Sequence, residues 1–112
     1  MSKETLLQRQ QRFAEMSAKL ISKAIELGYQ VTLGDAFRDP RVHGQFGERK
    51  AYGASTSFHK LRLAIDLNLF RNGIFLSKTE DHKGLGEWWE SQGGTWGGRF
   101  SDADGNHYSW GE

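Results

Sequence analysis

The sequence predicts an α+β fold in which one N-terminal helix packs on a small antiparallel sheet. From Leu6 to Leu27, large apolar residues recur every seven positions, which is typical of the buried stripe of a helix. Residues 63–70 alternate instead between large apolar and small or polar residues, which is typical of a half-buried strand. The chain has 112 residues, enough for one core, so we expect one domain over residues 1–112.

The first half of the chain predicts one helix, one strand and one long loop. The helix is expected to end at Gly28, because glycine suits the left-handed cap. Residues 29–33 alternate and are rich in β-forming residues, so they predict a strand. Residues 34–40 are expected to turn, and the polar residues 41–56 to form an exposed loop.

The second half predicts a hairpin, a short helix and a closing strand. Asn72-Gly73 is a strong hairpin signal, and residues 74–76 would form the returning strand. Residues 80–92 predict a second helix, and residues 107–110 alternate as a strand does. Because six glycines lie between positions 84 and 98, we expect the segment around Trp96 to be loop or turn. At least two of the four tryptophans are expected in the core.

Composition excludes several classes of protein. Cysteine is absent, so disulfides and thiolate metal sites are excluded. A net charge of +1 gives no support to a broad nucleic-acid-binding face. No apolar run approaches the roughly 18 residues of a membrane span, and the first sixteen residues lack the apolar core of a signal peptide. We therefore expect synthesis in the cytoplasm.

One stretch of the sequence, residues 57–67, predicts half of a metal site. His59 and Asp66 are seven positions apart, which would separate them by roughly 10 Å on one helix or 23 Å on one strand. Neither distance suits two ligands of one ion, so we expect a turn between His59 and the strand that carries Asp66. Ala64, on the same strand face, would leave space for the ion.

The other half of the predicted site lies in residues 102–107, where Asp104 stands three positions before His107. Three protein ligands and one open position are the pattern of a catalytic zinc ion, and His59, Asp66 and His107 would supply those ligands. Asp104 would be a second carboxylate that accepts a proton from water. His43 and His82 are expected to be solvated loop residues.

The pattern S-x-H-x(6)-D, followed near residue 107 by an acidic residue, two others and His, resembles the zinc D-Ala-D-Ala carboxypeptidase and dipeptidase family of VanY and VanX type. Phage endolysins with L-alanyl-D-glutamate endopeptidase activity belong to the same group. The similarity covers roughly residues 29–112 and includes Gly34–Arg38 and the tryptophan- and glycine-rich residues 88–98. It implies a fold of the hedgehog and D-Ala-D-Ala peptidase type.

By this resemblance His59, Asp66 and His107 are zinc ligands and Asp104 is the general base. Arg38 would stabilise the oxyanion or hold a substrate carbonyl or carboxylate, and Ser57 would bind the substrate. Many members have glycine where this chain has Arg62. The carboxypeptidases and dipeptidases carry Glu at the position of Asp104, whereas the endolysins carry Asp, which favours the endopeptidase.

The implied function is zinc-dependent hydrolysis of peptide bonds in peptidoglycan stem peptides. We would expect the protein to remain in the host cytoplasm until a holin-like pore releases it to the cell wall, or to be carried in a virion. No nucleic-acid partner and no membrane span are expected.

Two other hypotheses are compatible with the residues. A non-catalytic module could use the same fold to bind cell-wall peptides or nucleic acid, and a metal-dependent nuclease could use the same ligands. The nucleic-acid alternative rests on a basic and aromatic patch, which is the feature that single-strand binders need. The patch would comprise Arg38, Arg41, Arg49, Lys50, Lys60 and Arg62, with Phe37, Phe46 and Tyr52.

Overall fold

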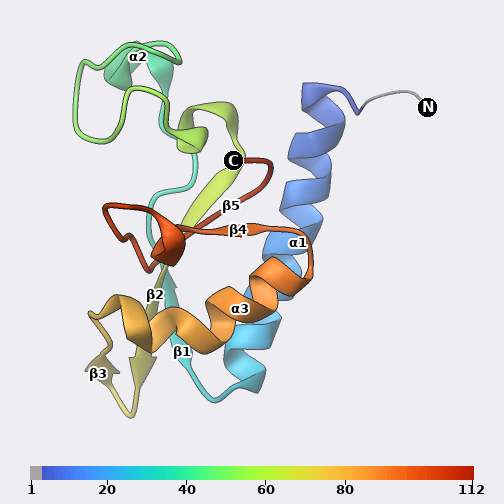
Figure 1. Ribbon diagram of the computed structural model, residues 1–112, viewed down its shortest axis with the longest axis vertical. Coiled ribbons are helices and arrows are strands. Elements are labelled where there is room, and N and C mark those ends of the chain that lie inside the picture. Colours follow the sequence, from blue (N-terminus) through green and yellow to red (C-terminus); the bar gives the residue numbers. More distant parts are fainter. Residues whose placement is uncertain (1–3) are drawn as a thin grey trace.

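A computed structural model describes residues 4–112 and confirms the α+β class (Figure 1). The strands are β1 (Gln30–Leu33), β2 (Ala64–Arg71), β3 (Ile74–Phe75), β4 (Thr95–Trp96) and β5 (His107–Ser109). The α-helices are α1 (Leu6–Glu26), α2 (Pro40–His43) and α3 (Lys83–Ser91). Three short 3-10 helices are η1 (Phe58–Leu61), η2 (Thr79–His82) and η3 (Gly97–Arg99).

Helix α1 begins and ends where its sequence predicts. The Thr5 hydroxyl accepts a hydrogen bond from the backbone of Gln8, whose side chain accepts one from the backbone of Thr5 in return. At the other end Gly28 has φ +93°, a left-handed conformation that favours glycine. The seven-residue stripe supplies the buried Phe13 and Leu20.

Strand β2 is the centre of a five-stranded antiparallel sheet. The order is β1-β2-β5-β4, and β3 also pairs with β2. Asn72 and Gly73 both have positive φ in the tight turn between β2 and β3, as their sequence predicts. Residues Leu63, Leu67 and Leu69 are fully buried in a core shared with α1 and α3.

The opposite face of the sheet remains available for polar side chains. Tyr108 of β5 is buried in the core, so its neighbours His107 and Ser109 project to the other side together with Asp66. Helices α1 and α3 cross on the core side (Figure 1). The sheet therefore separates a helix-covered apolar face from a polar face that can hold a site.

The prediction of loop or turn around Trp96 is wrong. Trp96 belongs to β4, where it pairs with Tyr108, and its side chain is 3% exposed. A Cβ atom on Gly86 or Gly98 would lie 2.2 Å from the Trp96 ring. These glycines are needed for clearance around an indole, so their density does not mark turns here.

His43 and His82 are also not the solvated loop residues that the sequence suggests, because both are buried. His82 Nδ1 lies 2.8 Å from the Tyr108 hydroxyl, and His43 Nδ1 lies 3.2 Å from the Tyr52 carbonyl oxygen. Trp89 and Trp96 are buried, which confirms that at least two tryptophans belong to the core.

The fold withdraws Lys60 from the basic and aromatic patch that the sequence suggests. Lys60 is 6% exposed, and its ammonium donates to the carbonyl oxygens of Gln45, Glu48 and Ser55, closing the loop over residues 44–55. The Arg62 guanidinium lies 3.8 Å from the centre of the Phe37 ring.

Within residues 4–112, no helix combines the length and apolar character needed to cross a membrane.

Replacement of Gly86 by alanine should destabilise the protein. The added methyl group would overlap the Trp96 ring, and overpacking of a core costs about 1–3 kcal/mol. Urea unfolding measures the effect. Gly84→Ala is the matched control, because the same helix leaves open space at that position. Equal stability of the two variants would contradict the prediction.

His82 should make the folded state sensitive to mild acid. Burial lowers the pKa of His82 to about 4, whereas the unfolded chain has a value near 6.5. Between these two pKa values His82 is protonated in the unfolded chain but neutral in the folded protein. The free energy of unfolding therefore decreases as the pH falls from 6.5 towards 4. The loss from pH 7 to pH 4.5 should be about 2–3 kcal/mol smaller in His82→Asn than in the wild type, as measured by urea unfolding. An identical loss in both proteins would refute this assignment.

Candidate metal centre

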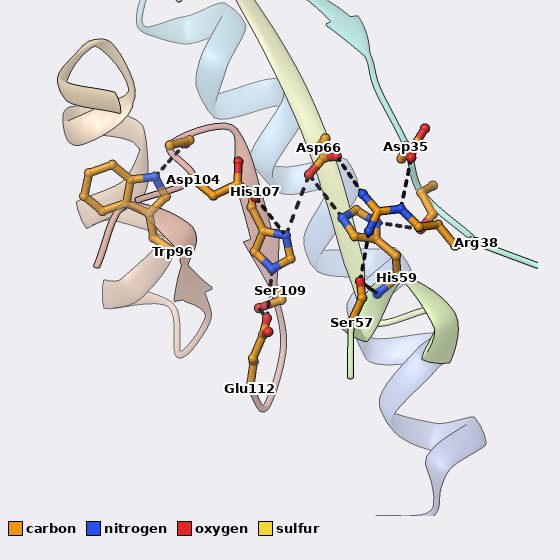
Figure 2. A network of polar contacts seen from close by, with 12 residues as sticks. Asp35, Arg38, Ser57, His59, Asp66, Trp96, Asp104, His107, Ser109 and Glu112 are labelled. Carbon is orange, nitrogen blue, oxygen red and sulfur yellow. Dashed lines mark hydrogen bonds and ion pairs between the residues drawn. The ribbon is translucent and has the colours of Figure 1, made fainter. Parts of the chain in front are cut away.

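Three side chains converge on the polar face of the sheet (Figure 2). Asp66 lies on β2, His107 is its antiparallel partner on β5, and His59 comes from η1. His59 Nε2 lies 3.1 Å from Asp66 Oδ1, and His107 Nδ1 lies 3.7 Å from the same oxygen. The three prospective ligand atoms all lie within 4.8 Å of one another. Residues far apart in the sequence thus meet around one point.

A residue with a left-handed backbone conformation, Arg62, forms the turn that places His59 beside Asp66. Arg62 follows η1 with φ +58° and ψ +35°, and β2 begins two residues later. This conformation explains why glycine would be suited to the position. The turn that the spacing of His59 and Asp66 requires is therefore present, and Arg62 adopts the strained conformation with its side chain stacked on Phe37.

The outer nitrogens of both imidazoles are already bonded, which leaves the inner ones for a metal ion. His59 Nδ1 lies 2.8 Å from the Ala36 carbonyl oxygen, so it carries the hydrogen and Nε2 keeps its lone pair. His107 Nε2 lies 2.8 Å from Glu112 Oε1, and its Nδ1 faces Asp66. Carbonyl and carboxylate partners of this kind orient histidine ligands in metal sites. The donor set of two imidazoles and one carboxylate therefore fits a divalent metal ion.

The electrostatics of the three side chains show an ionised carboxylate that needs a positive partner. Burial opposes ionisation of Asp66, but hydrogen bonds with His107 and His59 lower its pKa to about 2. Burial also disfavours the charged form of His107, yet the carboxylates of Asp66 and Glu112 raise its pKa to about 9. A metal ion would take the place of that proton between the imidazole and Asp66.

Asp104 lies at the edge of this centre. Its Oδ2 atom is 3.9 Å from His107 Nδ1, and its side chain is 53% exposed. Partial burial and the neighbouring Asp66 carboxylate raise the pKa of Asp104. The carboxylate is thus accessible to solvent and has a stronger affinity for a proton than an ordinary aspartate, as a general base requires.

Arg38 reaches the centre from the opposite side and is held by several groups. Its Nε atom donates to Asp35 at 3.0 Å, and Nη1 donates to Ser57 Oγ at 3.2 Å. Nη2 lies 3.8 Å from Asp66 Oδ2. A Cβ atom on Gly53 would lie 2.4 Å from Nη1, so only glycine leaves room for this guanidinium. Arg38 is therefore a fixed positive group beside the carboxylate.

Ser57 has two local partners. Its hydroxyl accepts hydrogen bonds from Arg38 and from the backbone N–H of His59, and the second of these caps the N-terminus of η1. It also lines a cavity of about 490 Å³. Arg38, His59, Asp104 and His107 line the same cavity, so all the predicted site residues except Asp66 border it.

Three residues around the site, Glu112, Ser109 and Tyr52, are not among those that the sequence predicts for it. Glu112 holds His107, and the Ser109 hydroxyl donates to the same Glu112 oxygen at 2.6 Å. Asp35 holds Arg38 and accepts a hydrogen bond of 2.7 Å from the Tyr52 hydroxyl. These residues act on the side chains that face the centre, and no local motif of the sequence marks such partners.

The fold and its polar centre define an α+β protein whose sheet presents two histidines and one aspartate as ligands for a metal ion. Residues 51–110 match the family described as D-alanyl-D-alanine carboxypeptidase, and the chain belongs to that family. Membership makes it a metal-dependent peptidase that acts on peptidoglycan peptides of the D-Ala-D-Ala type. A search of curated proteins finds no match to the chain.

Glu112→Gln should weaken metal binding about 10- to 100-fold, which is the usual effect of removing a partner of a ligating histidine. Glutamine keeps the shape of the side chain but loses the charge that orients and polarises His107. Isothermal titration calorimetry of the metal-free protein with a divalent ion measures the change. Glu15→Gln, at an exposed position of α1, is the control. Equal affinities of the two variants would show that Glu112 does not support the ligand.

Proposed function

We propose that this chain is a zinc peptidase that hydrolyses a peptide bond within peptidoglycan stem peptides. The supporting observation is the convergence of His59, Asp66 and His107, whose inner atoms all lie within 4.8 Å of one another. Two imidazoles and one carboxylate form a ligand set used by catalytic zinc sites, which keep a further position open. All 112 residues would form one catalytic domain.

Zinc in such a site supplies Lewis acidity, which polarises a carbonyl group and lowers the pKa of water. The chain's own groups perform the remaining tasks. Asp104 accepts a proton from the attacking water and later delivers it to the amine of the leaving group. Its raised pKa and its exposure to the 490 Å³ cavity suit both transfers.

Arg38 would stabilise the negative charge that develops on the carbonyl oxygen. Its bonds to Asp35 and Ser57 fix the guanidinium before substrate arrives, so little reorganisation is needed during the reaction. Ser57 would contribute to substrate binding from the wall of the cavity and hold Arg38 in place.

Within the family, we propose the endolysin type of activity, an L-alanyl-D-glutamate endopeptidase of phage or prophage origin. The aspartate at position 104 supports this assignment, since the similar carboxypeptidases and dipeptidases have glutamate there. D-Ala-D-Ala carboxypeptidase activity is the other candidate. The protein would act at the cell wall after release through a holin-like pore or from a virion.

Asp104→Asn should lower the rate of hydrolysis about 10²- to 10⁴-fold while leaving metal affinity nearly unchanged. The amide cannot accept the proton, whereas the three ligand side chains are intact. Loss of turbidity of purified cell walls gives the rate, and mass spectrometry of released muropeptides identifies the bond that is cut.

Asp102→Asn is the matched control for this experiment, because Asp102 lines the same cavity and the substitution makes the same chemical change. A chelator should abolish activity in the wild type, and added zinc should restore it. Wild-type protein that carries one zinc ion and lyses no wall would refute the peptidase and favour a binding module.

A further inference from the structure

A second cavity borders the catalytic base. It has a volume of about 210 Å³, and its walls include Ala103 and Asp104, which also line the larger cavity. Residues 103–104 therefore form a wall common to both cavities. The smaller one occupies the gap along β2 between the end of β3 and the start of β5, because it is lined by Asn68, Phe75 and Asn106.

The walls of this cavity are polar and include one lysine whose ammonium group has no partner among residues 4–112. Asn68 follows Asp66 on the same face of β2, and Thr79 and Asn106 add further hydrogen-bonding groups. Lys78 is exposed, and no hydrogen bond or ion pair of its ammonium occurs among residues 4–112. Asp104, the general base, is the one carboxylate among the lining residues.

His82 provides a second and independent sign of a binding site. It is 3% exposed and lines the cavity, and its Nδ1 atom is taken by the Tyr108 hydroxyl. Within residues 4–112 no hydrogen bond joins Nε2 to another protein group, so the second ring nitrogen of this cavity-lining histidine has no protein partner. A nearly buried histidine that lines a cavity and has one ring nitrogen without a protein partner can form a hydrogen bond with a ligand there.

We propose that this second cavity, formed around Asn68, Lys78, Thr79, His82 and Asn106, is a subsite for a carboxylate-bearing residue of the stem peptide. That residue would lie on the other side of the scissile bond from the residues that occupy the larger cavity. This inference rests on the proposed peptidase function and deepens it. A carboxypeptidase needs room for one terminal residue beyond the bond, whereas cavities on both sides of Asp104 suit an internal bond.

The chemistry favours a carboxylate over a cationic or apolar group. The Lys78 ammonium would form a charge-assisted hydrogen bond with it, and the amides of Asn68 and Asn106 and the hydroxyl of Thr79 can donate as well. Stem peptides carry free carboxylates on D-glutamate and on the diamino acid, and either could supply the group. The volume of about 210 Å³ is below that of a site for a whole small ligand, and it fits one side chain of a longer chain.

The test compares Lys78→Met with Lys83→Met, which removes an exposed lysine from α3 outside the cavity. The substrates are synthetic stem peptides in which the D-glutamate carboxylate or the diamino-acid carboxylate is replaced in turn by the carboxamide. For one of the two carboxylates, Lys78→Met should raise KM about tenfold with kcat unchanged, and the matching carboxamide should do the same to the wild type. The carboxamide should then have no further effect on Lys78→Met, which identifies the bound group.

A binding measurement keeps this proposal separate from the proposed activity. The side-chain amide NMR signals of Asn68 and Asn106 in the zinc-loaded protein should shift when the carboxylate peptide is added, and less so in Lys78→Met. Shifts without hydrolysis would support the subsite and refute the peptidase. Hydrolysis with unshifted signals, or with equal KM values for Lys78→Met and Lys83→Met, would overturn the subsite and leave the peptidase intact.

Discussion

The ionised carboxylate of Asp66 is the constraint on which the rest of the site depends. It sits on the central strand, where burial opposes its charge, and the two imidazoles stabilise that charge. Breaking such a group of buried charges by removing one partner leaves an uncompensated charge, which is costly. The fold must therefore place both η1, with His59, and β5, with His107, beside Asp66 on β2. A divalent metal ion bound there would also compensate the negative charge of Asp66.

The sequence is sufficient to predict the elements whose residues report directly on local geometry. The seven-residue stripe of α1, the alternation of β2 and the Asn72-Gly73 turn each follow from one physical rule. The proximity of His59 and Asp66 could be predicted because a distance argument leaves only a turn between them, whereas His107 is assigned from the pattern of residues 104–107 and the family resemblance. Register then places His107 opposite Asp66, which no spacing rule supplies.

The errors arise where tertiary contacts override local chemistry. Glycine around Trp96 signals a turn by its backbone freedom, but Gly86 and Gly98 are required by the volume of the indole. His82 lies in a polar segment, yet the hydroxyl of Tyr108, 26 residues away, makes its burial possible. The role of Glu112 could not be predicted for the same reason, because its contact with His107 depends on the path of the chain after β5. Partners of ligands are thus the part of a site that sequence reasoning recovers least.

The two halves of the site differ in how firmly they are held, and the difference has a chemical purpose. Arg38 is fixed by Asp35, Ser57 and the close approach of Gly53, as a group that must meet developing charge without reorganisation should be. Asp104 has no comparable support, since its side chain is half exposed and, among residues 4–112, its one ion-pair partner within 4.0 Å is His107. A base that takes a proton from water and later delivers it to the leaving amine must come within hydrogen-bond reach of both groups, which a loosely held side chain can do. The rigid arginine and the freer aspartate therefore match the opposite demands of oxyanion stabilisation and proton transfer.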